Sequence, residues 1–117
     1  MSDPLAPLLN LTYEEAGGCW GLAARAAQIM GLVLPESPED ALARRTALGT
    51  VVDGRAPARG DLVVFDDADG RADHVGIMVD RFRVLHASSS AGVLLQRLEH
   101  VAAAHPIRSR VRLEAQS

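Results

Sequence analysis

The sequence predicts an α+β fold in which N-terminal helices pack on an antiparallel β-sheet. Three observations support this class. Apolar residues with helical spacing from residue 19 to 30 and helix-capping residues from Ser37 to Gly49 come first, whereas short runs of branched apolar residues separated by turn-forming stretches follow residue 60. Helices followed by strands, rather than alternating with them, are typical of α+β proteins. At 117 residues, the chain is long enough for one core, so residues 1–117 are expected to form a single domain.

The N-terminal segment, residues 1–11, is expected to be an irregular lead-in. Its leucines have no place in the helical stripe that follows, so they pack either back onto the domain or against a partner protein. Thr12 then offers an N-cap, with Glu15 three positions on, which predicts a short helical turn. Gly17 and Gly18 are expected to end that turn.

Two longer helices are expected next. Apolar spacing predicts a helix over about 19–30, with Gly31 in the position of a C-terminal glycine cap. A second helix is predicted between Ser37, as N-cap, and Gly49, just past its end, with Pro38 at the first helical position.

The remainder of the chain has the pattern of a sheet. The predicted strands are 60–66, 74–80, 82–87, 92–98 and an edge strand 107–113. Asp69-Gly70 predicts a hairpin turn, and a short helical piece is expected around Leu98 to Ala104.

The composition indicates an aliphatic core and argues against several classes of protein. The hydrophobic fraction is 48%, yet there are only one Trp, one Tyr and two Phe. The net charge is −3 and the basic residues are scattered, which argues against a nucleic-acid-binding surface. No stretch has the length of a membrane span or the pattern of a signal peptide, so we expect a soluble chain that is cytoplasmic when synthesised.

Cys19 is the only cysteine, so it cannot form an internal disulfide. It stands after a glycine pair and at the first turn of the predicted helix. There the positive end of the helix dipole favours a thiolate, and the glycines allow a substrate to approach closely. Cys19 is therefore either a nucleophile or a small hydrophobic residue of the core.

Two histidines stand on strands expected to pack against this helix. His74 opens one strand and His86 ends the next, so both rings lie near one end of the sheet if the strands are hairpin neighbours. His74 would then take the thiol proton, and His86 would hold its tautomer. The alternative for each is a partly buried ring bonded to backbone. His100 and His105 lie in a polar stretch and are expected at the solvated surface.

Four motifs in order, "CWGLAARAAQIMGLVLP", "ARGDLVVF", "HVGIMVD" and "LHASSSAGV", resemble the NlpC-type papain-like cysteine peptidases, bacterial and phage enzymes that cut peptidoglycan stem peptides. The resemblance implies a papain-like fold without a cofactor, with Cys19 as nucleophile, His74 as general base and His86 as the residue that orients it. The "CWGL" form is similar to members encoded in phage and prophage tail-assembly regions.

The segment before the nucleophile departs from the family pattern. Gly18 stands where members commonly carry Asp, and "TYEEAGG" is shorter than the usual glycine-rich loop. Tyr13 is the candidate for the tyrosine that lines the oxyanion pocket. Gly18 and Trp20, which flank Cys19, complete the expected substrate pocket.

The resemblance implies hydrolysis of a D-glutamyl to diamino-acid bond in a stem peptide through an acyl-enzyme. The implied partners are the stem peptide and phage or prophage tail proteins, which would carry the chain into a virion or to the cell wall. Three alternatives stay open. The chain is a structural tail component with weak or no catalysis, an acyltransferase of the same fold, or a Cys-His-His zinc protein, although the spacing matches no local zinc motif.

Overall fold

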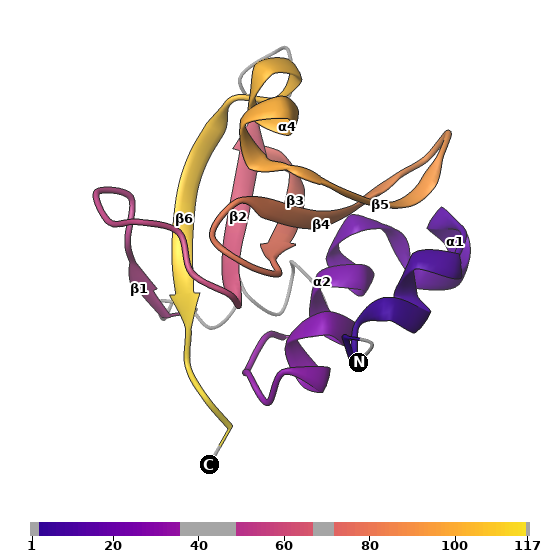
Figure 1. The fold of residues 1–117 in the computed structure, drawn as a ribbon, viewed down its shortest axis with the longest axis horizontal. Helices are drawn as coiled ribbons and strands as arrows, with labels where there is room; N and C mark the ends of the chain where they lie inside the picture. The colour runs from indigo at the N-terminus through magenta and orange to yellow at the C-terminus, as the bar shows by residue number, and fades with distance from the viewer. Residues whose placement is uncertain (1–2, 36–48, 67–71, 117) are drawn as a thin grey trace.

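The computed structural model describes residues 3–35, 49–66 and 72–116. In these residues an N-terminal group of helices packs on an antiparallel sheet (Figure 1), which confirms the α+β class. The helix predicted between Ser37 and Gly49 and the Asp69-Gly70 hairpin lie outside the described residues.

The sheet contains six described strands. They are β1 (Gly49–Val51), β2 (Asp61–Asp66), β3 (Ala72–Met78), β4 (Arg83–Ser88), β5 (Gly92–Arg97) and β6 (Ile107–Leu113). Their spatial order is β1-β6-β2-β3-β4-β5, and every neighbouring pair is antiparallel. The five predicted strands are confirmed, and the predicted helical piece is α4 (Leu98–Ala104), which connects β5 to β6.

The prediction that residues 107–113 form an edge strand is wrong. β6 lies between β1 and β2, because Gly49–Val51 pairs along its outer side. A strand of three residues is too short to show the alternation that reveals strands in a sequence. The edge of the sheet beside β6 is therefore formed by β1, a strand that the sequence analysis did not predict.

The two helices that carry the cysteine segment meet at one glycine. α1 (Tyr13–Ala16) begins with the predicted capping box: the Thr12 hydroxyl accepts from the Glu15 N–H at 3.1 Å, and the Glu15 carboxylate accepts from the Thr12 N–H at 2.9 Å. Gly17, in the left-handed conformation with φ of 83°, is both the C-cap of α1 and the N-cap of α2 (Gly18–Ile29).

The N-terminal segment is more regular than expected. Residues Ala6–Asn10 form a 3-10 helix, η1, instead of an irregular lead-in, and η1 packs against β5. Leu5 and Leu8 are buried in the main core, whereas Leu9 stays 41% exposed. Leu5 and Leu8 therefore pack back onto the domain itself, the first of the two placements predicted for these leucines.

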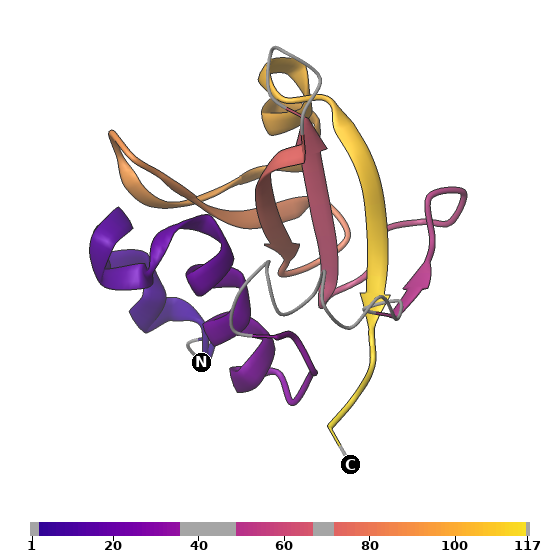
Figure 2. The same ribbon diagram turned by 180° about the vertical axis from the view of Figure 1, so that it is seen from behind.

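Apolar side chains fill both faces of the sheet, since successive residues of a strand point to opposite sides. On one face, α2 packs on β3 and β4 through small buried residues, Ala23, Ala26 and Ala27. On the other face, Val63 and Phe65 belong to a second cluster with Val101 of α4. Figures 1 and 2 show α1 and α2 on one side and α4 away from them.

A buried carboxylate joins β2 to β6. Asp61 is fully buried and accepts from Arg110 Nη1 at 2.9 Å, from Arg112 Nε at 2.9 Å and from the Ala58 N–H at 3.0 Å. Burial by itself raises the pKa of Asp61, but the bonds from Arg112, the Ala58 N–H and Arg110 together hold it below its ordinary value. Asp61 is therefore charged and held by charged partners in the folded chain.

No helix in the described part of the chain is both long enough and apolar enough to cross a membrane.

Candidate active site

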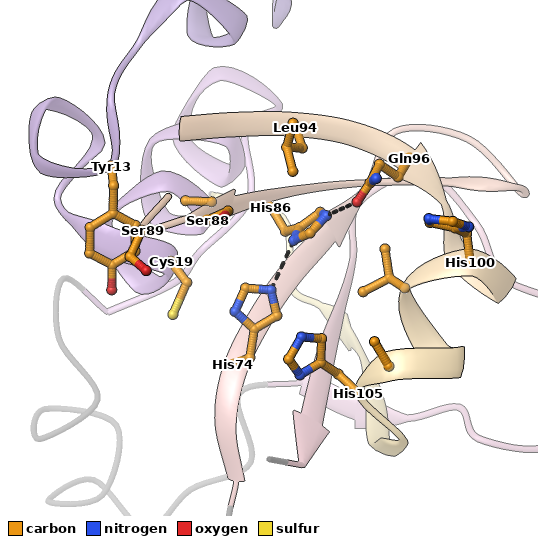
Figure 3. A pocket seen from close by; sticks show the side chains of 13 residues that line it. Tyr13, Cys19, His74, His86, Ser88, Ser89, Leu94, Gln96, His100 and His105 are labelled. Atoms are coloured by element: carbon orange, nitrogen blue, oxygen red, sulfur yellow. Dashed lines mark hydrogen bonds between the residues drawn. The ribbon is translucent and has the colours of Figure 1, made fainter. Parts of the chain in front are cut away.

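A cavity of about 410 Å³ opens between the N-terminal ends of α1 and α2 on one side and α4 on the other (Figure 3). Strands β3, β4 and β5 contribute the residues between them. Among the described residues that line the cavity, none is aspartate or glutamate. These residues are Tyr13, Cys19, His74, His86, Ala87, Ser88, Ser89, Leu94, Gln96, His100, Val101, Ala104 and His105.

Cys19 is the second residue of α2 and is partly exposed to the cavity. The first backbone N–H groups of a helix have no intrahelical partner, and the helix dipole is positive at this end. Gly17 and Gly18 precede the thiol with φ values of 83° and 75°. The sharp turn that these glycines make places the thiol at the mouth of the cavity rather than within the core.

His74 and His86 form a hydrogen-bonded pair. His74, from β3, faces the sulfur of Cys19 in Figure 3, and its Nε2 lies 3.0 Å from Nδ1 of His86, from β4. The two rings meet edge-on, with an interplanar angle of 85°. His74 is half-buried and His86 is 6% exposed. The structure thus brings Cys19, His74 and His86 into one cavity.

The strand register explains how the two rings meet. Gly76 lies directly opposite His86, and His74 lies two residues before Gly76, on the same face of β3. A Cβ atom at Gly76 would lie 2.7 Å from Cγ2 of Val84 and 3.3 Å from Cβ of His86. Only glycine therefore leaves room for β4 to approach with His86 in this position.

Gln96, which the sequence did not indicate, continues the chain of polar side chains. Its Oε1 lies 2.7 Å from Nε2 of His86. Burial lowers the pKa of His86 below its ordinary value; the bond to Gln96 opposes this and the charge of His105 adds to it. Gln96 reaches His86 across the β4–β5 hairpin, whose register depends on a turn length that the sequence does not reveal.

His100 and His105 are exposed, as expected, but both also line the cavity. The ring of His105 lies 5.4 Å from that of His74, with the planes tilted by 34°. α4 folds back over the sheet and carries these two residues toward the pair on β3 and β4. All four histidines of the chain consequently border one cavity.

The other predicted pocket residues separate into two groups. Tyr13 lines the cavity near Cys19 (Figure 3). Gly18 does not line it, although a Cβ atom there would lie 3.3 Å from the Tyr13 hydroxyl. The Trp20 indole N–H donates to the Pro35 carbonyl at 2.7 Å, so Trp20 anchors the segment after α2 instead of lining the cavity.

Substituting Gly18 tests the contact with Tyr13. Gly18→Ala and Gly31→Ala place a side chain at nearly the same left-handed backbone, φ of 75° and 73°, so each is expected to lower the free energy of unfolding by about 1–2 kcal/mol. The Gly31 position is open: apart from its chain neighbours, no described residue has an atom within 4 Å of the added Cβ. Only Gly18→Ala is therefore expected to change the alkylation rate of Cys19, measured with iodoacetamide beside thermal melts. Equal alkylation rates in Gly18→Ala and Gly31→Ala would show that the contact between residue 18 and Tyr13 does not affect Cys19.

Within residues 3–35, 49–66 and 72–116, no three His, Cys, Asp or Glu side chains are placed to hold a metal ion. The zinc interpretation therefore finds no ligand set in this part of the chain.

Comparison with known proteins identifies the family. The NlpC/P60 family model matches residues 13–111. None of the curated proteins is detectably similar to the chain. The fold is similar to that of NlpC2 from Trichomonas vaginalis, with a TM-score of 0.69 and 21% identity over 92% of this chain, which spans only 44% of that one. These findings agree with the resemblance of the four sequence motifs, and the chain belongs to the NlpC/P60 family.

Proposed function

We propose that the protein is a cysteine peptidase that hydrolyses an amide bond in peptidoglycan stem peptides. One observation carries the proposal: a thiol at a helix N-terminus and a hydrogen-bonded histidine pair open into the same cavity. Membership of the NlpC/P60 family supports cell-wall peptidase or amidase activity.

In the proposed reaction, His74 takes the Cys19 proton and the sulfur attacks the scissile carbonyl carbon. The N–H of Cys19 and the Tyr13 hydroxyl donate to the resulting oxyanion. His74 then protonates the leaving amine as the carbon–nitrogen bond breaks, which leaves a thioester on Cys19. A water molecule, deprotonated by His74, attacks the thioester and releases the acid and the thiol.

The proposed scissile bond joins D-glutamate to a diamino acid. The described lining of the cavity suits an anionic stem peptide, because it combines histidines with serine hydroxyls. The "CWGL" motif supports the further proposal that a phage or prophage tail protein delivers the chain to its substrate.

The decisive experiment is mass spectrometry of purified muropeptides after incubation with the protein. We expect two product fragments whose masses identify the cleaved bond, and no cleavage by Cys19→Ala of equal melting temperature. Intact muropeptides after incubation with folded wild-type protein would contradict the proposal.

Thiol reactivity separates an enzyme from a structural tail component that has kept only the fold. We expect iodoacetamide to alkylate Cys19 at neutral pH faster than it alkylates free cysteine, because the thiol stands at a helix N-terminus and His74 can take its proton. A rate equal to or below that of free cysteine would favour the structural component.

A further inference from the structure

We propose that Gln96 is a positioning residue that fixes the proton positions on His86 and His74, so that Nδ1 of His74 faces Cys19 without a proton of its own. The inference rests on the proposed function, in which His74 accepts the thiol proton. It starts from the unbroken line of hydrogen bonds from Gln96 through His86 to His74 in Figure 3.

Donor and acceptor roles along this line follow from one atom. The Oε1 of Gln96 can only accept, so the proton of His86 is on Nε2. A neutral imidazole carries one proton, which leaves Nδ1 of His86 as an acceptor. The 3.0 Å bond between the rings then requires His74 to donate through Nε2. The remaining nitrogen of His74, Nδ1, is therefore unprotonated and able to take a proton.

These roles require a neutral His86, and its surroundings favour the neutral ring. His86 is 6% exposed, and burial lowers its pKa. Among the described residues that line the cavity, the titratable neighbours of His86 are Tyr13, Cys19 and the other three histidines, and none is a carboxylate that would favour a charged imidazole. A neutral His86 keeps the lone pair that receives the His74 proton.

The same hydrogen bonds also hold His74 when it is charged during the proposed reaction. When His74 takes the thiol proton at Nδ1 it becomes an imidazolium, and its Nε2–H continues to donate to Nδ1 of His86. The proton later leaves from Nδ1 to the amine, and His74 returns to its starting tautomer. Gln96 exchanges no proton with the thiol or the leaving amine in these steps; it acts through His86.

The test compares two substitutions of Gln96. Gln96→Met keeps a similar length but removes the acceptor, whereas Gln96→Glu keeps an acceptor at the same reach and adds a negative charge that favours a doubly protonated His86. The matched control is Gln28→Met, which changes an exposed glutamine on α2. Nitrogen-15 NMR of histidine-labelled protein reports which ring nitrogen carries the proton, and iodoacetamide alkylation against pH reports the effect on Cys19.

We expect wild type and Gln28→Met to show the Nε2–H tautomer at both His86 and His74, and Gln96→Glu to show a His86 ring that is protonated at both nitrogens. Gln96→Met is expected to mix the His86 tautomers and to lower the alkylation rate at neutral pH by about 3- to 10-fold, the worth of one hydrogen bond. An Nδ1–H tautomer at His86 in wild type would overturn the inference. So would Gln96→Met with wild-type tautomers and pH profile, or Gln96→Glu with the behaviour of Gln96→Met.

These measurements need no stem peptide. If the tautomers behave as expected but wild-type protein leaves muropeptides intact, the proposed function fails while the role of Gln96 stands. If Gln96→Met does not fold, the wild-type and Gln96→Glu spectra still decide the question.

Discussion

Replacing His74 by alanine is expected to lower the rate of stem-peptide cleavage by about 10²- to 10⁴-fold, the usual contribution of a general acid–base. The same side chain takes the thiol proton and returns it to the leaving amine in the proposed reaction. The substitution is also expected to lower the alkylation rate of Cys19 at neutral pH, because the thiol loses the group that takes its proton. Cleavage of muropeptides and alkylation against pH, measured on one preparation, check both effects.

Two other histidines provide graded comparisons. His86→Ala is expected to lower the alkylation rate of Cys19 less than His74→Ala does, because His86 acts on the thiol only through the 3.0 Å bond to His74. His100→Ala, on the far side of the cavity, is expected to leave the alkylation rate unchanged. If His74→Ala and His86→Ala both had negligible effects, the three side chains would not form a catalytic unit.

Replacing Asp61 by alanine is expected to lower the free energy of unfolding by about 3–5 kcal/mol, since it leaves the buried Arg110 without its carboxylate. That loss is a large part of the total stability of a domain of this size. Glu99→Ala, which removes the partner of Arg97 in a solvent-exposed ion pair, is expected to cost less than about 1 kcal/mol. Chemical denaturation of both variants measures the difference, and similar losses would contradict the distinction between buried and exposed pairs.

The same carboxylate makes an acid-dependent contribution to stability. The folded chain holds the pKa of Asp61 below its ordinary value, so the stabilisation is complete above the unfolded pKa of about 3.9 and is lost as the pH falls through the folded pKa. We therefore expect the melting temperature of wild type to decrease below about pH 4 more steeply than that of Asp61→Asn. Parallel pH dependences of the two proteins would show that Asp61 does not titrate in this way.

The features that could be predicted from the sequence are those that depend on residues close together in the chain. The capping box at Thr12, the helix over about 19–30 with Gly31 at its end and the main strands all have local causes. Gln96 and His105 reach the histidine pair only through the β4–β5 register and the return of α4 over the sheet. No pattern within a few residues encodes such contacts, so the outer part of the site could not be predicted.

The single glycine between α1 and α2 gives the short segment before Cys19 a thermodynamic advantage. A long flexible loop would have to lose conformational entropy whenever a substrate ordered it. Here Tyr13 and Cys19 belong to two helices joined through Gly17 alone, and the capping box fixes the start of the first. The relative placement of hydroxyl and thiol is thus determined when the chain folds, and substrate binding meets a preorganised pair.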